Sequence, residues 1–273
     1  MLSHDIEQIE FDLFIKAIYK RHGYDFGNYS KASILRRLKL FLEKSPYSNL
    51  SECISPLLRD ENFFGNLLST CLISVTELFR DPSFFKTCIQ KIVPILKTYP
   101  FIKIWHAGCA TGEEVYSMAI LLTEMGFSKK FLLYGTDINH EALRVAQEGI
   151  YRIDELERAS LRYTEAGGKY SLSHYYHQKY GYGKFLDSLK ENVVFSTHNL
   201  DTDGIFGDMH VILCRNVLIY FKRPLQNKVI SLFQNSLVHR GFLCLGPKES
   251  MDFMEKKDKF EVISEREKIF RKL

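Results

Sequence analysis

The sequence predicts an α/β protein with a doubly wound, mainly parallel sheet and an N-terminal all-helical domain. Up to about residue 98 the apolar residues recur at helical spacing, and from residue 101 short β-rich runs alternate with helical segments. Repeated strand–helix units favour a parallel sheet that is covered on both faces. A chain of 273 residues can form one large domain with an appendage, or two modest domains.

We expect a helical domain over residues 1–80, a linker helix over 81–98 and an α/β domain over 99–273. The first helix ends at Gly23, a plausible C-cap, and the linker helix starts with Asp81 as N-cap and Pro82 at the first helical position. The expected helices up to residue 98 are "IEQIEFDLFIKAIYKRHG", "SKASILRRLKLFLEKS", "NLSECISPLL", "ENFFGNLLSTCL" and "DPSFFKTCIQKIVPILK".

The α/β domain alternates between the two kinds of element. The expected strands are "FIKIWHA", "KFLLYGTD", "NVVFSTHNL", "MHVILCRNVL" and "GFLCLG", and the expected helices are "EEVYSMAILLTEM", "NHEALRVAQEG" and "RPLQNKVISLFQNSLV". The tail "FEVISEREKIFRKL" is typical of two strands joined by a charged turn, which favours an antiparallel final hairpin. Residues 152–190 are tyrosine-rich and irregular, so we expect an inserted subdomain there.

Composition favours a soluble cytoplasmic protein. The net charge of +4 is too mild to indicate nucleic-acid binding, and the six cysteines form no CxxC pair, as expected for reduced, mostly buried thiols. The acidic start "MLSHDIEQIEFDLF" lacks the features of a secretory signal, and no apolar run approaches the roughly 18 residues that span a bilayer. We therefore expect no membrane insertion.

The stretch "WHAGCATGEEVYSMAI" joins a strand to a helix, as nucleotide-binding turns do. Gly108 and Gly112 would let the backbone approach a ligand beyond the strand. The GxGxxG spacing for dinucleotides and the GK[ST] of a P-loop are both absent, and Glu113 and Glu114 would repel phosphate. The expected ligand therefore carries no phosphate and can be cationic.

S-adenosylmethionine meets both conditions, because it carries a sulfonium, an ammonium and no phosphate. Asp137, at the end of "YGTD", could accept both ribose hydroxyls, as the acidic residue does in dinucleotide folds. The alternative is that Glu113 and Glu114 only stabilise a helix N-terminus through its macrodipole. Their combination with Asp137 favours the cofactor.

Several motifs, in the same order, resemble the chemotaxis receptor methyltransferases of the CheR family. They are "VTELFRDPSFF", "IWHAGCATGEEVYSMAI", "YGTDINHEALRVAQEGIY", "VVFSTHNL", "HVILCRNVLIYF" and "GFLCLGPKES", with "YDFGNYSKASILRRLKLFL" resembling the family's helical region. The resemblance implies a class I, Rossmann-like S-adenosylmethionine-dependent methyltransferase. It also implies methyl transfer to glutamate side chains of chemoreceptors, which forms methyl esters, tunes signalling and releases S-adenosylhomocysteine.

The resemblance also implies roles for individual residues. Arg80 and Tyr220 become the candidate catalytic residues, with Tyr220 close to the transferable methyl. The sequence departs from the family pattern at Ser74, Leu78 and Val115. The candidate cofactor-binding residues are Ser74, Thr76, Arg80, Gly108, Glu114, Asp137, Asn199, Leu200, Arg215 and Asn216.

The implied chemistry agrees with the residue types. A glutamate acceptor, with a pKa of about 4.3, is already ionised at neutral pH, so no general base is required. The guanidinium groups of Arg80 and Arg215 suit carboxylates, whether on the acceptor or on the methionyl end of the cofactor. The Tyr220 hydroxyl or ring face could orient the acceptor or the sulfonium.

The expected partner is a glutamate-rich receptor helix. Residues 16–44 hold eight Lys/Arg against two acidic residues, a local excess of 8 − 2 = +6. Such a basic face would steer an acidic helix, and the resemblance implies that role for Arg36, Arg37 and Lys39. A merely solvated face is the alternative. We expect a monomer that binds no nucleic acid.

Other readings stay open. His174 and His177 have i, i+3 spacing but no third ligand nearby, so we expect no metal site. The acceptor could be a different protein or a small carboxylate, or the chain could be a cofactor-sensing regulatory module without turnover. A nucleic-acid methyltransferase is disfavoured, because the sequence has no [DNS]PP[YFW] motif.

Overall fold

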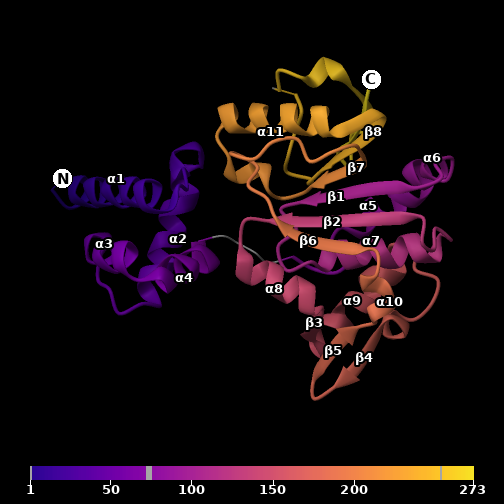
Figure 1. Ribbon diagram of the computed structural model, residues 1–273, viewed down its shortest axis with the longest axis horizontal. Helices are drawn as coiled ribbons and strands as arrows, with labels where there is room; N and C mark the ends of the chain where they lie inside the picture. The colour runs from indigo at the N-terminus through magenta and orange to yellow at the C-terminus, as the bar shows by residue number, and fades with distance from the viewer. Residues whose placement is uncertain (1, 72–75, 253) are drawn as a thin grey trace. The chain divides into compact units, whose positions relative to one another are not determined.

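The computed structural model describes residues 2–71, 76–252 and 254–273 (Figure 1). The chain divides into two compact units, one of residues 1–73 with 220–225 and one of residues 74–219 with 226–273. The division therefore lies before the predicted boundary at residue 80. Residues 81–98, predicted as a linker helix, belong to the larger unit.

The smaller unit is helical, as predicted. The first helix ends where expected, because Gly23 adopts a φ of +73° and its N–H donates to the carbonyl of Tyr19 at 3.0 Å. Phe14, Ile18 and Leu38 are buried in a core between the helices. The elements are α1 (Leu2–His22), η1 (Phe26–Asn28), α2 (Lys31–Glu43), α3 (Leu50–Arg59) and α4 (Glu61–Cys71).

A distant segment, residues 220–225, completes this unit. The Ser30 N–H donates to the carbonyl of Tyr220 and the Lys222 N–H donates to the carbonyl of Asn28, each at 2.8 Å. The rings of Tyr29 and Phe221 meet edge to face. Backbone pairing of this kind is not visible in any local sequence pattern.

The larger unit contains a seven-stranded sheet in the order β6-β2-β1-β7-β8-β10-β9. The first five strands in this order run parallel, and β10 is antiparallel to both β8 and β9, which confirms the predicted parallel sheet with a final hairpin. The strands are β1 (Ile102–Ala107), β2 (Phe131–Asp137), β6 (Val193–Thr197), β7 (Met209–Cys214), β8 (Leu237–Leu245), β9 (Phe260–Ser264) and β10 (Ile269–Lys272).

The helices follow the predicted order, with one irregularity at Pro94. Proline has no N–H to donate to the carbonyl four residues earlier, and its ring clashes with that carbonyl. The helix therefore widens into a π-turn, η2, in which Val93 donates to Cys88. The helices and turns of this part are α5 (Pro82–Thr87), η2 (Cys88–Ile92), α6 (Val93–Leu96), α7 (Glu113–Glu124), α8 (His140–Glu148), η4 (Leu218–Tyr220), α11 (Arg223–Ser236) and η5 (Lys257–Lys259).

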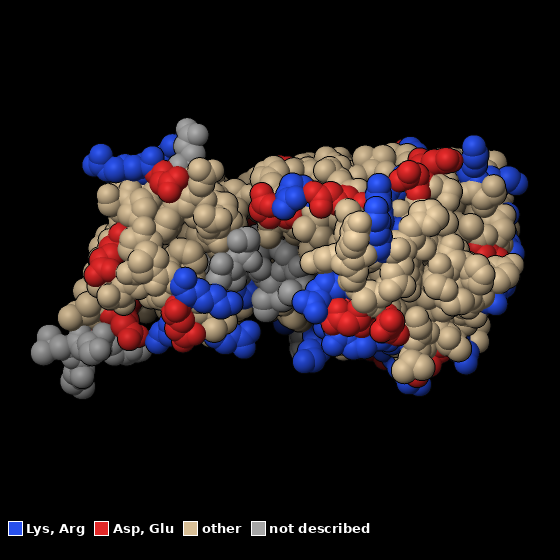
Figure 2. Space-filling model, turned by 90° about the horizontal axis from the view of Figure 1, so that it is seen from below, with Lys and Arg blue, Asp and Glu red and all other residues tan. Residues whose placement is uncertain are grey.

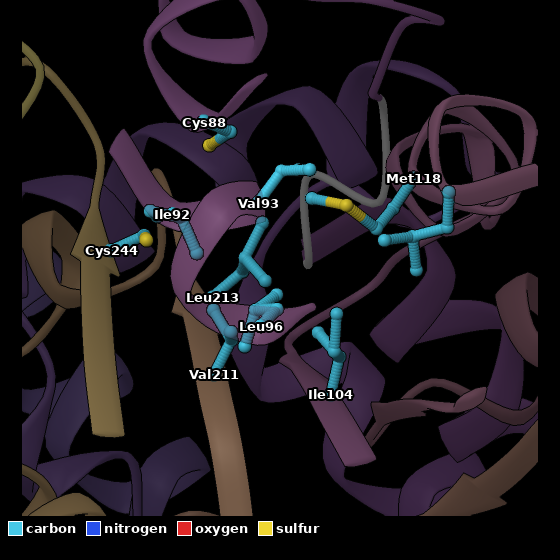
Figure 3. A pocket seen from close by; sticks show the side chains of 10 residues that line it. Cys88, Ile92, Val93, Leu96, Ile104, Met118, Val211, Leu213 and Cys244 are labelled. Carbon is cyan, nitrogen blue, oxygen red and sulfur yellow. The ribbon is translucent and has the colours of Figure 1, made fainter. Parts of the chain in front are cut away.

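The π-turn covers the sheet over β1, β7 and β8. Figure 3 shows the side chains of Ile92, Val93 and Leu96 together with those of Val211 and Leu213 around a small gap. The gap measures about 10 Å³ and its lining is apolar, so it offers no hydrogen bond to a ligand. It is a packing imperfection of the core.

An inserted subdomain lies between α8 and β6, where it was predicted, but it consists of regular helices and strands, so the expected irregular structure over 152–190 was wrong. A three-stranded antiparallel sheet, in the order β3-β5-β4, lies with α9 (Figure 1). Leu156, Ala159 and Tyr163 bury one face of α9, a helical spacing that the many tyrosines obscured. The elements are β3 (Ile150–Arg152), α9 (Ile153–Glu165), η3 (Leu172–Tyr175), β4 (Tyr176–Lys179), β5 (Tyr182–Phe185) and α10 (Asp187–Lys190).

One carboxylate of α7 makes several hydrogen bonds to this insertion. Glu124 accepts hydrogen bonds from the hydroxyls of Tyr163 and Tyr175 and from the N–H of Lys169. The two histidines of the possible metal motif lie on different elements, His174 in η3 and His177 on β4, so they do not share a helix face.

The structure bears on the cysteines and on membrane-spanning segments within the described residues. Cys53, Cys88, Cys109, Cys214 and Cys244 are buried and form no disulfide. No helix in the described part of the chain is long and apolar enough to cross a membrane.

Candidate active site

The turn after β1 is fixed by hydrogen bonds to the neighbouring strand. The N–H groups of Gly108 and Cys109 both donate to the carbonyl of Thr136, at 2.8 and 2.9 Å. Gly108 and Gly112 have φ values of +79° and +91°, which L side chains rarely adopt. A Cβ at Gly108 would lie 2.6 Å from Val217, so this glycine is needed for close packing between two turns of the protein itself.

The two glutamates that follow the turn point to different environments. Glu114 is buried, and its carboxylate lies 2.8 Å from Nη1 of Arg215 and 3.1 Å from Nδ1 of His106. Glu113 instead accepts a hydrogen bond from the Thr111 hydroxyl at 2.7 Å and lines a separate pocket of about 490 Å³.

Arg215 bridges two carboxylates. Its Nη2 lies 2.7 Å from Oδ2 of Asp81, and its guanidinium stacks over the ring of Phe84, 4.1 Å from the ring centre. Asp81 is the N-cap residue of α5, as predicted, but it has a φ of +57° and its side chain makes no capping bond. Its carboxylate binds Arg215 instead, because a charge-assisted bond to a guanidinium is stronger than one to a neutral backbone N–H.

The cluster of Asp81, Glu114 and Arg215 carries one positive and two negative charges, a net charge of −1. Burial raises the pKa of Glu114, but the charge of Arg215 and the hydrogen bond with His106 outweigh burial and lower this pKa to about 2. Glu114 is therefore ionised at neutral pH. Both Nη atoms of Arg215 are held by the chain's own carboxylates.

Asp137 lies at the carboxyl end of β2, beside the same turn. Its two oxygens accept the N–H groups of Ala110 at 2.8 Å and of Asn139 at 2.9 Å. Burial raises the pKa of Asp137, and backbone hydrogen bonds from Asn139, Ala110 and Ile138 partly offset that effect. The bond to Ala110 joins Asp137 directly to the turn.

The turn after β7 carries Arg215 and Asn216. Asn216 has a φ of +64°, an uncommon value for a residue other than glycine. The carboxylate of Glu249, only 4% exposed, accepts the N–H groups of Asn216, Val217 and Leu218. The sequence had not singled out Glu249, although it stands within the quoted motif "GFLCLGPKES".

The topology brings most of the predicted cofactor residues to one edge of the sheet. Gly108, Asp137, Asn199 and Arg215 each lie at or just after the carboxyl end of a parallel strand, and such ends meet at the same edge. The switch point lies between β1 and β7, where the strand order reverses. Ligands of doubly wound sheets bind there.

The remaining predicted cofactor residues differ in where they lie and in what they contact. Asn199 closes its own turn, because its side chain accepts the N–H of Asp201 at 2.9 Å, and Leu200 beside it is buried. Thr76 lines the pocket on the Glu113 side. For the Arg80 guanidinium the structure records no hydrogen bond or ion pair within the described residues. Ser74 lies outside the described residues.

Two residues assigned to different roles meet in the helical unit. The guanidinium of Arg37 lies over the ring of Tyr220, 4.3 Å from the ring centre, and Arg37 is only 2% exposed. Arg37 is therefore not part of an exposed basic face, contrary to the expectation for this residue. Arg36 and Lys39 are exposed, and Lys39 forms an ion pair with Glu7 at 3.4 Å.

The chemistry of the site fits a cationic, phosphate-free ligand. Two carboxylates outweigh one guanidinium around Glu114, and Asp137 adds a third carboxylate at the neighbouring strand end. The residues therefore fit S-adenosylmethionine, whose ammonium and sulfonium are positive and whose ribose needs an acceptor. Fold and site together define a class I S-adenosylmethionine-dependent methyltransferase.

Comparison with known proteins gives the family. The model of the CheR methyltransferase SAM-binding domain matches residues 74–269, and that of the CheR methyltransferase all-alpha domain matches residues 9–71. The chain belongs to the CheR methyltransferase family. It is 44% identical over 272 residues to the putative methyltransferase Cher3 of Pseudomonas putida, covering 100% of both chains.

Two further relatives carry a more specific name. A chemotaxis protein methyltransferase of Borreliella burgdorferi is 31% identical over 271 residues, covering 92% of this chain and 91% of that protein. Chemotaxis protein methyltransferase 1 of Vibrio cholerae is 28% identical over 280 residues, covering 96% of each.

Proposed function

We propose that this methyltransferase esterifies glutamate side chains of chemoreceptors. The observation that carries the proposal is the helical unit, which matches the all-alpha domain of the family and exposes basic residues such as Arg36 and Lys39. Relatives that are named chemotaxis protein methyltransferases match almost the whole chain, both domains included. A glutamate-rich helix is the acceptor that such a surface attracts.

The charges at the site support a carboxylate acceptor. When bound, S-adenosylmethionine supplies an electrophilic methyl group on a positively charged sulfur. Asp81, Glu114 and Asp137 would hold the cationic and ribose parts of the cofactor, and Arg80 is the guanidinium left to orient a carboxylate. The acceptor is already ionised, so positioning supplies the catalysis.

Residue types suggest which side chains contact the acceptor. Tyr220 would orient the acceptor through its hydroxyl, while Arg37 fixes the tyrosine ring from the other side. Because Arg37 is buried against the Tyr220 ring, we assign Arg37 to the support of the tyrosine and assign Arg36 and Lys39 to the surface that contacts the receptor.

The proposal is tested by methyl transfer from labelled S-adenosylmethionine to the receptors of the native cell. We expect label that alkali releases as methanol, because methyl esters hydrolyse in base. Asp137→Ala should give no label. If no receptor is labelled, or if the label survives alkali, the acceptor is a different one.

A matched pair of surface variants tests the helical unit. Arg36→Glu should slow receptor methylation, with the effect largest at low salt, because exposed charges are screened at high ionic strength. Arg266→Glu reverses an arginine side chain that is 86% exposed in the β9–β10 turn, and it should leave the rate unchanged. Equal effects of the two variants would show that α2 does not recognise the receptor.

On the face shown in Figure 2, Lys and Arg side chains are interspersed with Asp and Glu side chains. Such a mixed surface does not form the broad basic field on which binding to a nucleic-acid backbone depends. This agrees with a protein acceptor.

A further inference from the structure

Beside the site lies a buried carboxylate that has no cationic partner among the residues the structure describes. Glu249 is 4% exposed, and its oxygens accept four backbone N–H groups. Oε1 lies 2.8 Å from the nitrogens of both Val217 and Leu218, and Oε2 accepts from Asn216 at 3.2 Å and from Gly246. Within the described residues the structure records no ion pair for Glu249.

A buried carboxylate without a cation lowers the stability of the fold unless its hydrogen bonds offset the loss of hydration. Burial of a carboxylate costs free energy, and here the compensation comes entirely from backbone N–H groups. Burial raises the pKa of Glu249 even though all four bonds favour its ionised form. A neutral side chain would fill this space at lower cost, but it could not accept four N–H groups at once.

The bonded N–H groups belong to the turn that carries the site. Three of them are consecutive, at Asn216, Val217 and Leu218, directly after Arg215. Asn216 is held at a φ of +64°, a conformation that persists only where its surroundings enforce it. Glu249 supplies that enforcement.

The same turn closes against the glycine turn after β1. A Cβ at Gly108 would lie 2.6 Å from Cγ2 of Val217, so the Val217 side chain occupies the space that the glycine leaves. The N–H of Val217 is one of the two that share Oε1 of Glu249. Glu249 thus fixes the β7 turn relative to the β1 turn, although it follows β8 in the chain.

We propose that Glu249 is a positioning residue for the cofactor site. It holds Arg215 and Asn216 in the geometry that binds S-adenosylmethionine, and it does so through the backbone without touching the ligand. The inference rests on the proposed placement of the cofactor beside Arg215 and Asn216, and it does not depend on which acceptor is methylated.

The test is calorimetric titration of Glu249→Gln with S-adenosylhomocysteine, at a temperature where the variant is folded. Glutamine has nearly the same shape but replaces one acceptor oxygen by an NH₂ donor, so two of the four N–H groups lose their partner. We expect the Kd to rise at least about tenfold, because the turn relaxes in the free variant to give these N–H groups other partners, and binding must restore the native geometry with the N–H groups unpaired.

Glu124→Gln is the matched control. Glu124 also accepts several hydrogen bonds, but at the opposite end of α7 from the glutamates of the site. Both variants should lower the melting temperature, and only Glu249→Gln should weaken binding. A Kd within twofold of the native value for Glu249→Gln would overturn the proposal, as would equal weakening in both variants.

Asp137→Ala separates this proposal from the placement of the cofactor. If Asp137→Ala abolishes binding while Glu249→Gln binds normally, the role of Glu249 alone is refuted. If Asp137→Ala also binds S-adenosylhomocysteine normally, the cofactor site itself is misplaced, and the role proposed for Glu249 is refuted as well.

A measurement on the native chain covers the case in which Glu249→Gln does not fold. Hydrogen exchange of the Val217 and Leu218 amides, without cofactor, should be slowed at least about a hundredfold relative to an unstructured peptide, because both are bonded to a buried carboxylate. Exchange at the unstructured rate would contradict the proposal.

Discussion

Nη1 of Arg215 lies 2.8 Å from Oε2 of Glu114, which joins the start of α7 to the end of β7 across 101 residues of sequence. The same guanidinium binds Asp81, so it is surrounded by the chain's own acidic groups. The surplus negative charge of this cluster is the feature that distinguishes a site for a cationic cofactor from a phosphate site.

Glu114→Gln should destabilise the fold in a pH-dependent way. The pKa of Glu114 falls from 4.5 to about 2 on folding, so its ionised form contributes stability above pH 4.5 that is lost as the pH falls toward 2. The shift corresponds to about 3 kcal/mol at neutral pH. Chemical denaturation at pH 7 and pH 3 should show a smaller difference between native and variant at pH 3. A difference independent of pH would contradict the buried ion pair.

Glu113→Gln should stabilise the fold at high pH, opposite to the effect of Glu114→Gln. Burial raises the pKa of Glu113 to about 7, so the folded state holds its proton more tightly and loses stability as the pH rises from 4.5 to 7. Glutamine removes this penalty. The variant should therefore melt at a higher temperature than the native protein at pH 8, and at the same temperature at pH 4. A lower melting temperature at pH 8 would show that ionised Glu113 is stabilised by a partner.

Asp137→Ala should remove cofactor binding while the protein stays folded. Each hydrogen bond to a charged group is worth about 1.5–3 kcal/mol, so two bonds to the ribose hydroxyls correspond to about a hundredfold or more in Kd. Titration with S-adenosylhomocysteine measures the loss, and circular dichroism checks the fold. Retention of native affinity would remove Asp137 from the site.

Arg37 and Arg36 should behave differently although they are adjacent. Arg37→Met removes a buried guanidinium from the Tyr220 ring and should lower the free energy of unfolding by about 1–2 kcal/mol. Arg36→Met changes an exposed side chain and should stay within about 0.5 kcal/mol. Denaturant titration compares them directly, and equal effects would contradict the burial of Arg37.

The order of the elements could be predicted from sequence because it rests on local periodicity. Strands such as β1 and β2 are short β-rich runs, and the positions of Gly108 and Asp137 at their ends follow directly. The cofactor could be inferred for the same reason. A glycine turn followed by acidic residues is a local pattern with few chemical interpretations.

What could not be predicted depends on contacts between distant segments. The pairing of Arg215 with Asp81, the contact of Arg37 with Tyr220 and the four N–H groups at Glu249 leave no mark on local spacing. Arg37 is an example: its charge led to the prediction of an exposed face, and its burial is visible only in the three-dimensional structure. The inserted subdomain was predicted, but its helix and strands were not, because the tyrosine-rich stretch obscured the apolar spacing of α9.

The most direct test is a crystal structure of the protein with S-adenosylhomocysteine. We expect the ribose hydroxyls within hydrogen-bond distance of the Asp137 carboxylate and the ammonium beside the cluster of Glu114, Arg215 and Asp81. A ligand bound elsewhere, with no contact to the Asp137 carboxylate, would contradict this placement.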